Sequence, residues 1–174
     1  MDNLVDANAG LLIARLILGT LIAAHGSQKL FGWLGGYGLA GTGGFFEQLG
    51  FRPGRAFAAA ASVSEIAAGV LLVLGFLGPI GPALLVSVMI VAAVSVHWGH
   101  GLFAATNGIE VPLLYATGAL TLALTGPGAY SLDAVLGLDR LWSPGLEWAA
   151  IGAGVLAGVV NLAARRPAAS VVKA

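Results

Sequence analysis

Long apolar runs recur along the whole chain and limit what it can fold into. They cover residues 9–30, 56–77, 80–98, 110–125 and 145–164. A helix needs about 20 residues to cross a hydrocarbon core of about 30 Å, and most of these runs are close to that length. A transmembrane β-barrel would need alternating polar and apolar positions, which the continuous apolar stretch at 70–74 lacks. The sequence therefore predicts an all-α, polytopic transmembrane helix bundle.

Composition narrows the possible functions. The chain is 58% hydrophobic and 9% charged, with no net charge and no cysteine. The absence of a basic tract excludes nucleic acid as a partner, because phosphate binding requires clustered Lys and Arg. Without cysteine there is no thiolate nucleophile, iron–sulfur ligation or disulfide exchange. Any redox role must therefore depend on a bound cofactor or on a partner protein.

The distribution of basic residues predicts an orientation in the membrane. Residues 1–10 contain two aspartates and no Lys or Arg, unlike a cleavable signal peptide, so the first apolar run is expected to remain in the mature protein. With five spans, the positive-inside rule places the N-terminus outside and the C-terminus in the cytoplasm. We expect the protein to lie in the plasma membrane of a bacterium. The side predicted to be cytoplasmic carries Lys29, Arg52, Arg55, Arg165, Arg166 and Lys173.

Two connections between the apolar runs have their own character. Residues 31–55 are rich in glycine and aromatic side chains, which predicts a partly buried, re-entrant or interfacial loop. Residues 130–144 contain Asp133, Asp139 and Arg140 and are interpreted as a surface segment. Small residues spaced by three or four, such as Gly19 with Ala23 and Gly154 with Gly158, predict close helix packing within the chain, with an oligomer interface as the alternative.

Two charged residues lie inside apolar runs and need a partner or a water-filled cavity, because an unpaired charge in a transmembrane helix costs at least ~2.5–3.5 kcal/mol. These are Arg15 and Glu65. Three interpretations stay open: an Arg15–Glu65 pair between neighbouring helices, a substrate-binding or proton-relay role, and separate snorkelling to the two surfaces. The helical repeat puts a single stripe on the first helix that is expected to face the bundle; it consists of Arg15, Gly19, Ile22, Gly26 and Lys29.

A second group of polar residues is predicted to gather at one membrane face, because antiparallel helices alternate in direction. The group comprises His25, Lys29, His97, His100 and Glu110. Such a group is typical of a proton-handling or metal-binding site, although His and Trp at span ends are also ordinary interface residues. We assign no metal ligands. Haem ligation by His25 and His97 is an open alternative, but the sequence does not fix their relative depths.

Several sequence blocks resemble the DoxX family of small membrane proteins. They are IARL at 13–16, HGSQKLFG at 25–32, SEIAAG at 64–69, NGIE at 107–110 and GPGAYSLD at 126–133. The resemblance extends over residues 11–136. It implies a four-helix DoxX-like membrane domain at 1–136, to which this chain adds a connector and a fifth apolar helix at 137–164 and a polar cytoplasmic tail at 165–174.

The resemblance also implies a function. Members of the family are linked to membrane oxidoreductase assemblies for thiosulfate or quinol oxidation and for thiol or oxidative-stress chemistry. The chain is then expected to be a subunit, catalytic or not, that binds quinone or anchors a redox partner. A homo-oligomer is left open as a further partner. A small-solute or proton-coupled transporter and a non-catalytic assembly factor are the alternatives. The expected binding residues are Arg15, His25, Gln28, Lys29, Glu65, His97, His100 and Glu110.

Overall fold

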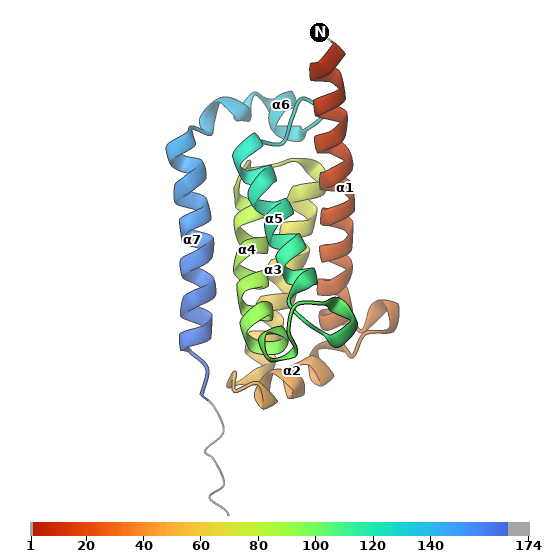
Figure 1. The fold of residues 1–174 in the computed structure, drawn as a ribbon, viewed down its shortest axis with the longest axis vertical. Coiled ribbons are helices and arrows are strands. Elements are labelled where there is room, and N and C mark those ends of the chain that lie inside the picture. Colours follow the sequence, from red (N-terminus) through yellow and green to blue (C-terminus); the bar gives the residue numbers. More distant parts are fainter. Residues whose placement is uncertain (1, 167–174) are drawn as a thin grey trace, which may run out of the picture.

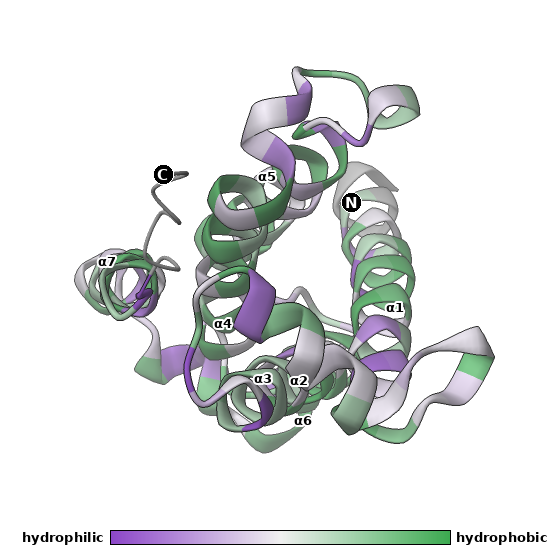
Figure 2. Ribbon diagram, turned by 90° about the horizontal axis from the view of Figure 1, so that it is seen from below, coloured by the Kyte–Doolittle hydropathy of each residue, from purple (hydrophilic) through white to green (hydrophobic). Residues whose placement is uncertain are grey.

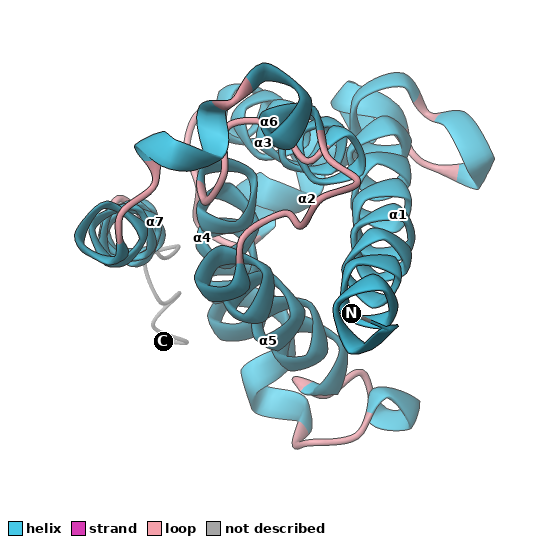
Figure 3. Ribbon diagram, turned by 90° about the horizontal axis from the view of Figure 1, so that it is seen from above, coloured by secondary structure: helices cyan, strands magenta, loops and turns pink. Residues whose placement is uncertain are grey.

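The chain folds into seven α-helices over the part that the structure, a computed structural model, describes, which is residues 2–166. The last eight residues, 167–174, lie outside it, and with them most of the predicted tail. The helices are α1 Asp2–Phe31, α2 Gly38–Gln48, α3 Gly54–Leu74, α4 Ile80–Ala92, α5 Glu110–Thr125, α6 Leu132–Leu136 and α7 Pro144–Ala163. Between residues 2 and 166 there are helices and connections and no strand (Figure 3).

Within residues 2–166, five long helices run side by side, and the two short ones, α2 and α6, cross the ends of the bundle (Figure 1). Helices α1, α3, α4 and α5 surround the common core, while α7 packs outside them, mainly against α4 (Figure 3). Helix α2 lies across the end at which α1 finishes, and α6 lies at the opposite end. The N-terminus and residue 166 consequently lie at opposite ends of the bundle.

In the described part of the chain, four helices are long and apolar enough to cross a membrane: Ala7–Phe31 of α1, α3, α4 with its extension to His100, and α7. Helix α5 has 16 residues, about 24 Å at 1.5 Å per residue, and by itself falls short of a hydrocarbon core of about 30 Å. The long helices consist mostly of hydrophobic residues (Figure 2), and many of their large apolar side chains are exposed. Leu114 is 63% exposed and Leu156 64%, so their solvent is lipid, and the chain is an integral membrane protein.

Small residues bring the helices together, as their spacing predicts. A Cβ atom added to Gly19 would lie 2.7 Å from the carbonyl oxygen of Gly69, so α1 and α3 cross with their backbones in contact. On α7, a Cβ on Gly154 would lie 2.4 Å from the carbonyl oxygen of Ala83 in α4. Close approach of this kind replaces the hydrophobic effect as the cause of helix association in lipid. The predicted stripe of α1 is confirmed, because Arg15 and Ile22 are each 1% exposed.

The prediction that residues 130–144 form a surface segment is wrong for Asp133. Its side chain is fully buried. It accepts hydrogen bonds from the backbone N–H of Leu77 at 2.9 Å and of Gly78 at 2.7 Å, and from Nε1 of Trp142 at 3.2 Å. The aspartate therefore fastens α6, and with it the segment 130–144, to the turn between α3 and α4. Within the predicted loop 31–55, residues 38–48 form α2 instead of irregular backbone.

Candidate functional site

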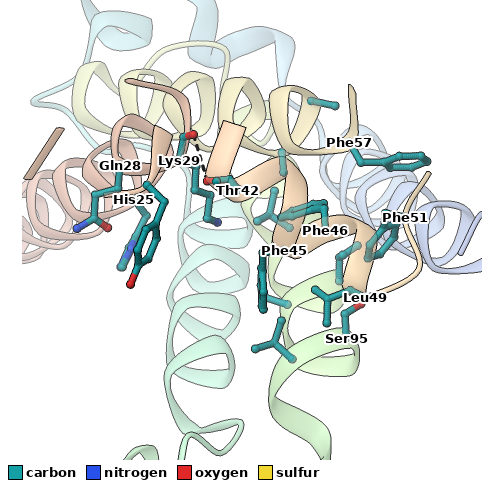
Figure 4. Close-up of a pocket in the computed structure, with 18 of the residues that line it drawn as sticks. His25, Gln28, Lys29, Thr42, Phe45, Phe46, Leu49, Phe51, Phe57 and Ser95 are labelled. Carbon is teal, nitrogen blue, oxygen red and sulfur yellow. Dashed lines mark hydrogen bonds between the residues drawn. The ribbon is translucent and has the colours of Figure 1, made fainter. Parts of the chain in front are cut away.

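A cavity of about 930 Å³ lies at the end of the bundle that α2 covers. Its walls come from α1, α2, α3, α4 and the end of α7. Figure 4 shows His25, Gln28 and Lys29 of α1 on one side and aromatic residues of α2 and α3 on the other. The polar lining residues are His25, Gln28, Lys29, Thr42, Gln48, Ser64, Ser87, Ser95, His97 and Asn161.

The apolar wall is a row of phenylalanine rings. Phe46 and Phe51 have ring centroids 5.5 Å apart, and Phe51 and Phe57 have centroids 5.2 Å apart. Phe45 lies beside this row and points toward α4 (Figure 4). Helix α2 is positioned by Thr42, whose hydroxyl donates a hydrogen bond to the carbonyl oxygen of Lys29 at 3.3 Å. The glycine- and aromatic-rich segment thus closes the cavity with flat, polarisable surfaces.

Lys29 joins the cavity to a buried carboxylate. Its ammonium group forms a salt bridge and hydrogen bond with Oε1 of Glu65 on α3. The side chain of Glu65 is 2% exposed, whereas that of Lys29 is 31% exposed. Glu65 sits behind the cavity wall, because Gly26 of α1 lets the two helices approach: a Cβ there would lie 3.0 Å from Cβ of Glu65. Glu65 therefore acts on the cavity through Lys29.

Of the three open interpretations of Arg15 and Glu65, the pair between them is wrong. Arg15 donates from Nη2 to the carbonyl oxygen of Tyr130, at the opposite end of the bundle. On α1 the two basic residues are 14 positions apart, about 21 Å along the helix axis, and Lys29 is the one level with Glu65. Arg15 packs against Gly75, where a Cβ would lie 1.7 Å from its Nη1. The long side chain of Lys29 reaches inward, which sequence reasoning on depth alone did not anticipate.

The predicted polar group at one membrane face divides in the structure. His25 and His97 line the cavity, whereas His100 and Glu110 do not. His100 Nδ1 lies 3.0 Å from the carbonyl oxygen of Val96, and Glu110 accepts from the backbone N–H of Ala104 at 2.7 Å. Both residues are thereby engaged in local bonds at the end of the bundle.

The two cavity histidines also have protein neighbours. The ring of His25 packs edge-on against Tyr115 of α5, with centroids 6.3 Å apart. His97 Nδ1 lies 2.8 Å from the carbonyl oxygen of Asn107. Among the residues that the structure describes, no three His, Asp or Glu side chains are placed to share a metal ion. Haem ligation by His25 and His97 stays an open alternative.

Ser95 is a cavity residue that sequence reasoning missed. It lies in a π-helical turn, Ala93–His97, which continues α4 along the cavity. Such turns are frequent at functional sites because they interrupt the regular hydrogen-bond ladder. The hydroxyl oxygen of Ser95 is buried and, within residues 2–166, has no hydrogen-bond partner. A serine inside an apolar run was the available signal, but small polar residues are too common in membrane helices for it to stand out.

The end of α7 completes the cavity wall. Asn161 lines the cavity. Just beyond the helix, Arg165 donates from Nε to the carbonyl oxygen of Leu49 at 2.9 Å, and its guanidinium lies 5.6 Å from the centre of the Phe51 ring. The backbone N–H of Arg166 donates to the carbonyl oxygen of Gly50 at 2.7 Å. The C-terminal end of α7 is consequently bonded to the turn that carries Phe51 of the aromatic row.

The charge of the cavity wall is one-sided. Of the cavity residues in the described part of the chain, one is a lysine, Lys29, two others are histidines, and none is Asp or Glu. The site combines flat aromatic surface, an ammonium group and a spare hydroxyl in a space within the usual range of ligand pockets, about 300–1,000 Å³. It suits an amphiphile with a planar head group and electron-rich oxygens.

Comparison with known proteins places the chain in a family. The DoxX family model matches residues 10–98, which is just over half of the 174 residues. No curated protein matches the chain, and no solved structure does. The matched residues run from the start of the α1 stripe to the π-helical turn and include α2, α3 and most of the cavity wall. The chain is a member of the DoxX family of membrane proteins.

Proposed function

We propose that the chain is a membrane subunit of a redox assembly and that its cavity binds a quinone-type lipid cofactor. The observation that carries the proposal is a cavity at the α2 end of the bundle, with His25, Gln28 and Lys29 on one side and aromatic rings on the other. Quinones are flat rings with two carbonyl acceptors and an apolar tail, so they need both kinds of surface.

The residues present fit such a head group. The rings of Phe45 and Phe46 supply a surface for stacking, which contributes about 0.5–1.5 kcal/mol for a pair of aromatic groups beyond the area buried. The ammonium group of Lys29 and the unpartnered hydroxyl of Ser95 supply donors for carbonyl oxygens. Gln28 is a weaker candidate, because its amide already donates to the carbonyl oxygen of Leu34 at 3.1 Å.

Each part of the site then has a task. The aromatic row excludes water and orients the ring, and Lys29 and Ser95 fix its carbonyl oxygens. A bound quinone would supply the capacity to accept electrons, which the chain lacks in its own side chains because it contains no cysteine. The electrons would come from a partner protein, in agreement with the redox assemblies linked to the family. The protein is then a binding subunit, not a complete oxidoreductase.

The test is binding of menadione to the detergent-purified protein, measured by thermal stabilisation and by isothermal titration. We expect saturable binding that raises the melting temperature, and a loss of at least about fivefold in affinity for Phe45→Ala, since a stacked ring contributes about 1 kcal/mol. Phe103→Ala is the matched control, because Phe103 is 65% exposed in a connection outside the cavity. Absence of binding, or equal effects of both substitutions, would contradict the proposal.

A further inference from the structure

The salt bridge between Lys29 and Glu65 is arranged so that one partner can change. Lys29 is 31% exposed and lines the cavity, while Glu65 is 2% exposed and lies behind it. Only Oε1 of the carboxylate is bonded; Oε2 is buried and has no hydrogen-bond partner in residues 2–166. The carboxylate of Glu65 is therefore hydrogen-bonded by a single ammonium group, and that group also lines the cavity.

Within residues 2–166, Lys29 is the one hydrogen-bond partner of the Glu65 carboxylate. From α1, His25 and Lys29 are near enough to interact with it electrostatically, and from α5 the hydroxyl of Tyr115 is. On the same helix as Glu65, the hydroxyl of Ser62 donates a hydrogen bond to the carbonyl oxygen of Ala58 at 2.6 Å. The α4 side chains in the buried core, such as Leu85, are apolar and carry no titratable group.

We propose that an anionic quinone-type ligand binds Lys29 in exchange for Glu65 and that Glu65 takes up one proton from solution as the ligand binds. This inference rests on the proposed function and specifies the charge of its ligand. In the exchange, Lys29 keeps its proton and forms the new ion pair with the ligand. The Glu65 carboxylate gains one proton and becomes a neutral acid, and no electron is transferred.

The physical reason is the cost of a buried charge without a partner. A carboxylate held away from water by apolar surroundings is expensive, and such a group becomes neutral instead. When the ligand engages Lys29, the alternative to protonation would be two negative charges around one positive charge in a nearly dry site. Uptake of a proton keeps the total charge of the site unchanged. Negative charge that reaches the cavity is then matched by a proton on Glu65.

The test uses anthraquinone sulfonate, which stays anionic, beside neutral menadione. Isothermal titration in buffers of different ionisation enthalpy counts the protons taken up on binding. We expect one proton per sulfonate bound, an affinity that falls about tenfold per pH unit while free Glu65 is ionised, and no uptake with menadione. The Glu65→Gln variant should bind the sulfonate without proton uptake and with little pH dependence.

A double variant protects the test against misfolding. Lys29→Met alone leaves Glu65 buried without a counter-ion, so the pair Lys29→Met and Glu65→Gln removes both charges together. It should weaken menadione binding only by the loss of one donor, about two- to tenfold, and abolish sulfonate binding. Sulfonate binding without proton uptake, or proton uptake that survives in Glu65→Gln, would overturn the exchange while leaving the proposed function intact. Failure of both compounds to bind the native protein would overturn both.

Discussion

The two ends of the bundle use buried charge in different ways. At the α6 end, Asp133 accepts three hydrogen bonds from Leu77, Gly78 and Trp142, and Arg15 holds the carbonyl oxygen of Tyr130. At the α2 end, Glu65 has one partner, and that partner faces a cavity. The two carboxylates differ in their partners: Asp133, held by three donors, fastens the fold, whereas Glu65 has a single partner that we propose can be exchanged for a ligand.

The largest effect should come from Asp133→Ala at the fastened end. Two backbone N–H groups and the Trp142 indole would lose their acceptor, and each unsatisfied buried donor costs about 1–3 kcal/mol. We expect a loss of about 3 kcal/mol or more in stability, seen as a much lower melting temperature and poor recovery from detergent. Asp139→Asn, at an exposed position of the same connector, should behave as the native protein. An equal loss in both variants would show that Asp133 is not a fastening residue.

The next largest effect on stability should come from the contact between α1 and α3, midway between the two ends of the bundle. Gly19→Val places side-chain atoms where a Cβ alone would lie 2.7 Å from the carbonyl oxygen of Gly69. Overpacking of this kind typically costs about 1–3 kcal/mol, and it should lower the melting temperature. Gly10→Val is the control, since nothing lies within 4 Å of a Cβ at that position. If thermal unfolding were equal in the two variants, α1 and α3 would not cross at Gly19.

At the cavity end, Ser95→Ala should change binding without changing stability. Its hydroxyl has no protein partner in the described residues, so its removal leaves no broken bond. Loss of one hydrogen bond to a ligand is worth about 0.5–1.5 kcal/mol, which is roughly a two- to tenfold weaker binding of menadione in titration. Ser27→Ala provides the comparison, because that hydroxyl donates to the carbonyl oxygen of Ala23 at 2.8 Å. A lower melting temperature with unchanged affinity in Ser95→Ala would assign Ser95 a structural role.

The smallest effect concerns the tie between α7 and the aromatic row. Arg165→Ala removes a hydrogen bond to Leu49 and the contact with the Phe51 ring, and a cation–π contact at a partly exposed site is worth about 0.5–1 kcal/mol. Faster hydrogen exchange at residues 49–51 should report it. Arg166→Ala should have less effect, because Arg166 is held through its backbone N–H. The reverse order would mean that the guanidinium does not hold the helix end.

Much of the fold could be predicted from the sequence, because lipid demands long apolar helices and small residues at their crossings. The face of α1 that carries Arg15 and Ile22 followed from the 100° step alone. The partner of Glu65 did not, since it depends on which basic residue of α1 lies level with it after the helices cross. Asp133 was misjudged because short polar segments are usually exposed, and here three donors converge on one carboxylate.

The cavity itself was beyond sequence reasoning. The sequence shows that residues 31–55 are rich in aromatic side chains. Their position in one cavity with Ser95 depends on the packing of α2 against α3 and α1. A π-helical turn has no clear sequence signal in a short apolar stretch such as 93–97. Local pattern therefore fixed which residues face inward and left open which of them share a space.

The most direct test of the binding claim is photo-crosslinking with an azido-naphthoquinone, followed by mass spectrometry of the labelled peptides. We predict labelling within residues 37–57 and 87–97, which contain the aromatic row and Ser95, and protection by excess menadione. Labelling spread over lipid-facing positions of α5 and α7, unaffected by menadione, would contradict a quinone site in this cavity.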